Sequence, residues 1–242
     1  MRGPERKILV LESAMSKKLI GFVALVVVVG AIGKMRAQMA AYPTAAPLEQ
    51  YMIADKAAEI ELAKSAAPAA ISDGAEVLVL GKDGYSAAVK GGNGFTCLVE
   101  RAWGKDTGDA EFWNPKVRAP HCMNAAAATT YLPIVLLKTR LVMAGKSKAE
   151  IGQAVKAALD GKDWPVVAPN AMCYMMSKEQ YLSDNDMHWH PHMMWYVPGD
   201  ATQTWGANQA GVPVYAGYVP EDRMTVFMVV VGKWSDGTAV MH

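Results

Sequence analysis

The sequence predicts a single α+β domain in which an antiparallel sheet packs against about three helices. The sheet is expected to combine an N-terminal three-stranded meander with further C-terminal strands. Two observations predict this class. Strand-like segments are followed by helical ones and then by strands again, without regular alternation, and the first strands are joined by Asp-Gly and Asn-Gly, a strong hairpin signal.

The N-terminal 40 residues are expected to lie outside this domain, which would span residues 41–242. Lys17 and Lys18 precede an unbroken apolar stretch at 19–32, the order typical of a secretory signal, and residues before Met15 resemble an upstream extension. The stretch has about 14 residues, whereas a membrane span needs roughly 20. We therefore expect a cleaved signal and a periplasmic or secreted protein, with a membrane anchor as the alternative if the segment stays uncleaved.

The charge balance argues against nucleic acid as a partner. Removing residues 1–37 takes away seven basic residues and two acidic ones, which leaves a mildly acidic chain without a Lys/Arg cluster. Binding to a phosphate backbone would require a basic face.

The first elements of the domain follow from local patterns. Residues 47–66 place apolar groups at helical spacing with charged residues between them. Strands are expected at 76–80, 85–89 and 95–99, because glycine-containing turns separate these apolar segments.

The middle of the chain predicts a loop and then two helices. We expect an ordered loop over 103–122, because it contains Asn114-Pro115 and Ala119-Pro120. Asn124 can cap a helix that runs to about residue 145 and that Pro133 should kink or split. A capping box at 147–150 predicts a further helix that ends near residue 161. The remaining strands are expected at 171–177, 188–197, 212–218 and 225–234.

The strongest chemical signal is the histidine run His188, His190 and His192, which holds three of the five histidines of the chain. On an extended strand alternate side chains share a face, so all three imidazoles would point the same way. His188 and His192 would be about 13 Å apart on a straight strand, whereas a zinc–nitrogen bond is about 2.1 Å. One ion can therefore take all three only if the chain bends at Pro191; otherwise one His-x-His pair binds, and His190 belongs to both pairs.

Further ligands would have to come from elsewhere in the chain. His121 is the first candidate, and Glu100, Asp184 and Asp186 could contribute or could accept hydrogen bonds from the imidazole N–H groups. Zinc is the expected ion, with iron or copper as alternatives, since imidazole binds all three. The sequence thus favours an exported metal-binding protein, with hydrolase or oxygenase activity on a small substrate as one form of it.

Two other hypotheses remain open. In one, the chain is a non-enzymatic envelope protein whose aromatic, His-rich strand binds a ligand or a protein partner. In the other, Cys97 is the nucleophile of a hydrolase, although a position in the middle of a strand provides neither a helix N-terminus nor a cation to lower its pKa. In an oxidising compartment, two of Cys97, Cys122 and Cys173 would form a disulfide, or all three would be buried apolar residues.

Several segments together resemble a group of exported bacterial proteins to which no activity is attached. The resemblance covers most of the domain, implies the same localisation and carries no catalytic residues. The segments are TCLVER at 96–101, FWNP at 112–115, YMMSK at 174–178, HWHPH at 188–192 and KWSDG at 233–237.

Overall fold

The computed structural model describes residues 42–240. The expected signal or anchor segment at 1–40 lies outside the described residues. Among the described helices, none combines the length and the apolar character needed to cross a membrane.

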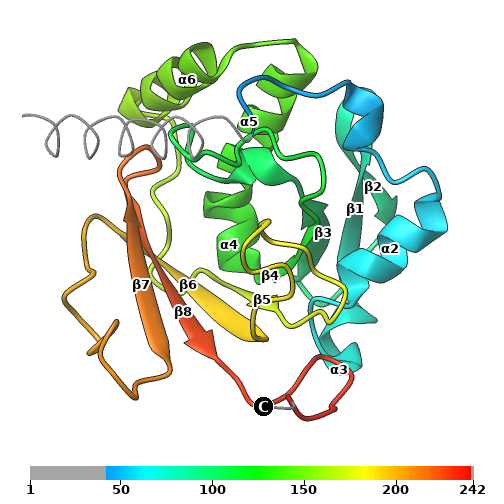
Figure 1. Cartoon of the computed structure of the whole chain (residues 1–242), viewed down its shortest axis with the longest axis vertical. Helices are drawn as coiled ribbons and strands as arrows, with labels where there is room; N and C mark the ends of the chain where they lie inside the picture. The colour runs from blue at the N-terminus through cyan, green and yellow to red at the C-terminus, as the bar shows by residue number, and fades with distance from the viewer. Residues whose placement is uncertain (1–41, 241–242) are drawn as a thin grey trace, which may run out of the picture. The chain divides into compact units, whose positions relative to one another are not determined.

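The described chain is one α+β domain built on an eight-stranded sheet with the strand order β2-β1-β3-β4-β5-β6-β8-β7 (Figure 1). The predicted fold class is confirmed, but the sheet is mixed and not purely antiparallel, because β1 and β3 run parallel. The strands are β1 (Glu76–Gly81), β2 (Gly84–Val89), β3 (Thr96–Glu100), β4 (Ala119–Met123), β5 (Met172–Met175), β6 (His192–Pro198), β7 (Val214–Val219) and β8 (Met224–Val230).

The predicted meander is only half right. The β1–β2 hairpin forms, and its turn ends at Gly84, whose φ of 102° suits glycine. β3 does not add to β2; it crosses to the far side of β1. Every residue of β3 is buried, whereas β2 is largely accessible, so this order places the buried strand inside the sheet and the accessible strand at its edge.

The crossing depends on a close backbone approach at Gly91. A Cβ built there would lie 2.0 Å from the backbone nitrogen of Glu76, so only glycine fits. After this point the loop is hydrogen-bonded to residues at and just before the start of β1, from the Gly92 N–H to the Gly74 carbonyl and from the Glu76 N–H to the Phe95 carbonyl.

β4 occupies the end of the segment 103–122, for which the sequence predicts a loop because it contains Pro120. Pro120 pairs with Val99 of β3, and the Val99 carbonyl accepts hydrogen bonds from Tyr85 and Arg101 instead. On the other side, the ladder between β4 and β5 includes only Cys122 and Met123. The missing N–H of Pro120 therefore removes no ladder hydrogen bond on either side.

The helices follow the predicted caps. The helix expected at 47–66 is shorter, because Asp55 caps it and residues 48–50 form a separate 3-10 turn. The split near Pro133 and the capping box at Ser147 are confirmed. The helices are α2 (Lys56–Lys64), α3 (Ala69–Ser72), α4 (Ala125–Thr130), α5 (Leu132–Met143) and α6 (Lys148–Asp160), with 3-10 turns η1 (Leu48–Gln50) and η2 (Ala102–Gly104).

Helices cover both faces of the sheet (Figure 1). α2 packs on β1, β3 and β4, where Ala63 and Ala66 contact Val77 and Val99. α4 and α5 pack against the other face, around Leu98 and Met123. The alternation of side chains along each strand therefore separates two cores, and the face below α4 is the one that carries the candidate site.

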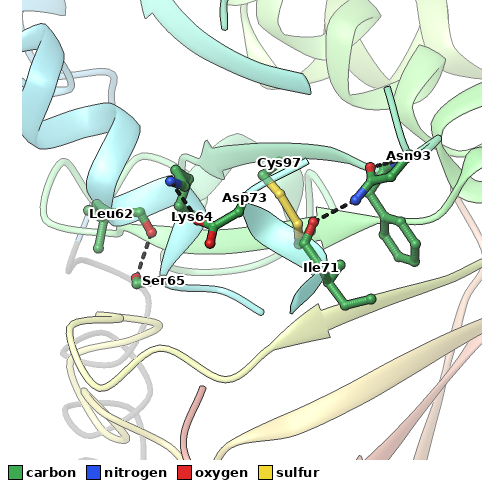
Figure 2. Close-up of a disulfide and its surroundings, with 9 residues drawn as sticks. Leu62, Lys64, Ser65, Ile71, Asp73, Asn93 and Cys97 are labelled. Atoms are coloured by element: carbon green, nitrogen blue, oxygen red, sulfur yellow. Dashed lines mark hydrogen bonds and ion pairs between the residues drawn. A yellow bond between two sulfur atoms is a disulfide. The ribbon is translucent and has the colours of Figure 1, made fainter. Parts of the chain in front are cut away.

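A disulfide joins Cys97 of β3 to Cys122 of β4 on the α2 face (Figure 2). Nearby contacts fix the loops around it: the Asn93 side chain donates to the Ile71 carbonyl at 2.7 Å, and Lys64 pairs with Asp73 at 2.9 Å. Within the described chain Cys173 is the free cysteine, and it is buried.

The disulfide should stabilise the domain substantially. Its two cysteines are 25 residues apart, and closing a loop of this size in the unfolded chain corresponds to about 3 kcal/mol. We expect dithiothreitol to lower the free energy of urea unfolding by about this amount. The Cys97→Ala/Cys122→Ala variant is the control: it should start less stable and show no response to the reductant, and an equal response in both proteins would contradict the assignment.

Candidate active-site pocket

Two histidines distant in sequence lie on one row of the sheet. His121 of β4 is in register with Met175 of β5, which pairs with His192 of β6. Residues in register across neighbouring strands share a face, so both imidazoles and the Met175 side chain lie on the face that carries α4. Glu100 of β3 pairs with Ala119, two residues before His121, and joins this face.

These residues line a pocket of about 290 Å³. Its walls are mainly apolar, and its buried titratable groups include Glu100, His121 and His192, together with Arg101 and two tyrosines. Hydrophobic walls with a few convergent polar groups are typical of small-molecule sites. The apolar and aromatic lining includes Val117, Tyr131, Met175, Leu182, Trp189, Met194, Tyr196, Val226 and Met228.

Glu100 is held in the pocket without a hydrogen-bond partner for one of its oxygens. Its Oε1 is fully buried and accepts no hydrogen bond from the described residues. Burial raises the pKa of Glu100 to about 8, against a smaller opposing effect of Lys138, so the carboxyl is protonated at neutral pH. Gly104 makes room for this group, since a Cβ there would lie 2.3 Å from Oε2.

The two imidazoles are neutral and oriented alike. His121 Nδ1 lies 2.9 Å from the Ala119 carbonyl, and His192 Nδ1 lies 2.8 Å from the His190 carbonyl. A carbonyl only accepts, so each Nδ1 carries the proton and each Nε2 keeps its lone pair. Burial lowers the pKa of both histidines to about 4, which keeps them neutral at pH 7.

The acid and one imidazole are close neighbours. His121 Nδ1 lies 3.7 Å from Glu100 Oε1, beyond hydrogen-bonding distance. Because the Nδ1 proton already faces the Ala119 carbonyl, it does not satisfy the Glu100 oxygen. The pocket therefore presents one carboxyl proton donor and two nitrogen acceptors to a molecule within it.

Trp189 forms the wall beside His192. The two ring centroids are 4.7 Å apart, and Tyr215 packs edge-on against the other side of Trp189 at 5.6 Å. The buried side chain of Gln180 donates to the Trp189 carbonyl at 2.5 Å and fixes the backbone there. Trp189 precedes β6, so the segment that enters this strand also closes one side of the pocket.

The predicted histidine site is not assembled as expected. β6 begins at His192, while His188 lies in a turn and is exposed together with His190. The expectation of three imidazoles on one strand face is therefore wrong, because the chain becomes extended only after Pro191. His121 and Glu100, both named from the sequence, are the residues that share the pocket with His192.

Two acidic candidates have other partners. Asp184 accepts hydrogen bonds from Tyr42 and Tyr181, both at 2.7 Å, and pairs with Lys116. The backbone N–H of Asp186 binds the Ser183 hydroxyl within an exposed turn. Asp184 thus tethers residue 42 to the segment before β6, which is a structural role.

The structure also bears on two chemical hypotheses, the metal site and the Cys97 nucleophile. Among the described residues no group of three or more His, Cys, Asp or Glu side chains is arranged to hold a metal ion. The zinc, iron or copper expectation remains a prediction that only metal analysis can test. A Cys97 nucleophile is contradicted by this structure, because the Cys97 sulfur is bonded to Cys122 and has no thiol.

Several pocket residues carry no signal in the sequence. Tyr131 and Tyr196 stack at 4.1 Å, and the Tyr196 hydroxyl lies 3.2 Å from the Cys173 sulfur. Each looks like an ordinary core residue along the chain. Their proximity arises only in the tertiary fold, where α4 packs on β4 and β5 and Tyr131 follows this helix.

Comparison with known protein families, with curated proteins and with solved structures gives no match to this chain. The resemblance to exported bacterial proteins therefore remains a prediction. Any functional conclusion depends on the geometry of the pocket itself.

Proposed function

We propose that this domain binds a small, mainly apolar molecule in the pocket and orients the polar group of that molecule with Glu100, His121 and His192. The observation that carries the proposal is the buried Oε1 of Glu100, which has no hydrogen-bond partner among the described residues. Leaving a buried polar atom unpaired costs about 1–3 kcal/mol. A site that binds a polar group gives this atom a partner and explains why the cost is tolerated.

The balance of donors and acceptors restricts the ligand. A protonated Glu100 donates one hydrogen bond, so the ligand needs an acceptor such as a carbonyl oxygen. Apart from Arg101 and Lys105, the remaining surface is formed mainly by methionine, valine, leucine and aromatic side chains, so the rest of the ligand should be apolar. The volume of about 290 Å³ limits it to a small molecule.

Binding can be tested with a matched pair of probes, 2-tetralone and tetralin, which share a bicyclic shape and differ in one carbonyl group. We expect 2-tetralone to bind about tenfold more tightly in calorimetric titrations, since it satisfies Glu100. Glu100→Met should remove this preference, because an apolar side chain of similar length donates no hydrogen bond. The exposed His188 provides the control, and His188→Ala should bind both probes as the parent does.

Two results would contradict the proposal. One is the absence of measurable 2-tetralone binding, and the other is equal affinity for the two probes in the parent chain. Metal analysis of the untagged, purified protein provides an independent check: one bound zinc, iron or copper ion per chain that His192→Ala abolishes would support the metal-binding hypothesis instead.

We also propose that the domain is exported. The Cys97–Cys122 disulfide supports this, because disulfides form and persist in oxidising compartments. Fractionation of cells that express the full chain should recover the oxidised domain outside the cytoplasm, and recovery of reduced protein in the cytoplasm alone would contradict export.

A further inference from the structure

We propose that the pocket is an acid–base site that enolises small ketones: His192 removes a proton from the carbon next to the carbonyl group, and Glu100 protonates the carbonyl oxygen. This inference rests on the proposed binding function and names its substrate class and reaction. The ketone oxygen is the acceptor that Glu100 requires.

The positions of the two groups suit this division of roles. Glu100 of β3 lies three strands away from His192 of β6, which corresponds to about 14 Å between the strand axes, and His121 of β4 lies between them. Glu100 lies on the His121 side, 3.7 Å from its Nδ1. Both side chains line the pocket, and the strands that carry His121 and Met175 lie between them, so a molecule lying over His121 and Met175 can contact the acid on one side and the base on the other.

The protonation states are those that the reaction needs. An acid must hold a proton and a base must lack one at the working pH, and burial produces both conditions here. It raises the pKa of Glu100 and lowers that of His192. The tautomer of His192 is also correct, since its Nδ1–H faces the His190 carbonyl and its Nε2 lone pair is left for the substrate.

The proton and electron balance closes within the protein and the substrate. His192 Nε2 takes the proton, and the electron pair of the broken C–H bond forms the new carbon–carbon double bond. The π electrons of the carbonyl move to oxygen, which takes the proton of Glu100. The products are an enol, an imidazolium and a carboxylate, and the reverse steps restore the ketone without a cofactor or an oxidant.

The surroundings of the acid favour the transfer. Lys138 is buried and close enough to lower the pKa of Glu100, an effect that is larger than the opposing effect of its partner Asp222, so Lys138 stabilises the carboxylate that forms when the proton leaves. The apolar walls strengthen these electrostatic effects relative to water. Trp189 packs on the His192 ring and limits the access of solvent to the base.

The test follows exchange of the α-hydrogens of 2-tetralone with D₂O by NMR at neutral pH. We expect the oxidised, full-length protein to raise the exchange rate well above that of buffer. His192→Asn and Glu100→Gln should each lower the protein-dependent rate by about 100-fold or more, since general acid–base catalysis contributes 10²–10⁴-fold. His188→Asn should retain the full rate, because His188 is exposed in the preceding turn.

The outcomes separate this inference from the binding proposal. Exchange at the buffer rate, despite calorimetric binding of 2-tetralone, would overturn the enolisation and leave binding intact. An unchanged rate in folded His192→Asn would also overturn it. Circular dichroism and thermal unfolding establish that each variant is folded, and Glu100→Met provides a second variant without the acid if Glu100→Gln is unstable.

Discussion

The free energy of unfolding should pass through a maximum near pH 6.5. Burial lowers the pKa of His121 and of His192 from 6.5 to about 4. Between these values the unfolded chain binds more protons than the folded one, so stability falls as the pH drops from 6.5 to 4. Each imidazole contributes on the order of a few kcal/mol to this loss.

Glu100 acts in the opposite direction. Its pKa rises from 4.5 to about 8 on folding, so the folded state holds a proton that the unfolded chain has released, and stability falls as the pH rises from 4.5 to 8. Below pH 6.5 the two imidazoles outweigh the single carboxyl, whereas above it the effect of Glu100 becomes the larger one. The two slopes therefore meet near pH 6.5.

Urea unfolding across pH 4–8 measures this profile. Glu100→Gln should remove most of the decline above pH 6.5, and His121→Asn should reduce the decline below it. His188→Asn should leave both slopes unchanged, because His188 is exposed. A parent stability that keeps rising to pH 8 would show that Glu100 is ionised in the folded protein and would remove the acid from the proposed reaction.

Local sequence signals predicted the elements that depend on neighbouring residues. The Ser147 capping box, the break at Pro133 and the β1–β2 hairpin each arise within a few residues of chain, and all three are present. The position of β3 beside β1 depends instead on the tertiary fold, which buries every residue of β3 and leaves β2 largely accessible. β4 can include Pro120 because neither neighbouring strand requires a hydrogen bond from the missing N–H of this residue. Neither property is visible in a local pattern.

The candidate site shows the same limit. Of the three histidines at 188–192, only His192 lines the pocket. His121 and Glu100 were named as distant contributors, and both are there because β3 and β4 pair in the register that aligns Glu100 with Ala119. Their protonation states follow from burial, and burial depends on the tertiary fold.

Lys138→Met should be among the most destabilising single substitutions in the domain, at about 3–5 kcal/mol near pH 7. The Lys138 side chain is completely buried in α5 and pairs with Glu221 at 3.2 Å and Asp222 at 3.1 Å, at the β7–β8 turn. It also donates to the Lys105 carbonyl. Methionine fills a similar volume but leaves the buried Asp222 and the partly buried Glu221 without a counter-charge, and that uncompensated charge produces the loss.

Adding Glu221→Gln and Asp222→Asn to Lys138→Met should recover a large part of the lost stability, because no unpaired charge then remains. The matched control is Lys156→Met on α6, whose exposed pair with Asp160 at 2.6 Å should contribute little, because water screens it. Urea unfolding compares all of these proteins. Equal losses for Lys138→Met and Lys156→Met would mean that water reaches the Lys138 cluster and screens its charges. That result would also contradict our inference that a buried cation stabilises ionised Glu100. The comparison therefore tests the electrostatics of the proposed active site independently of any ligand.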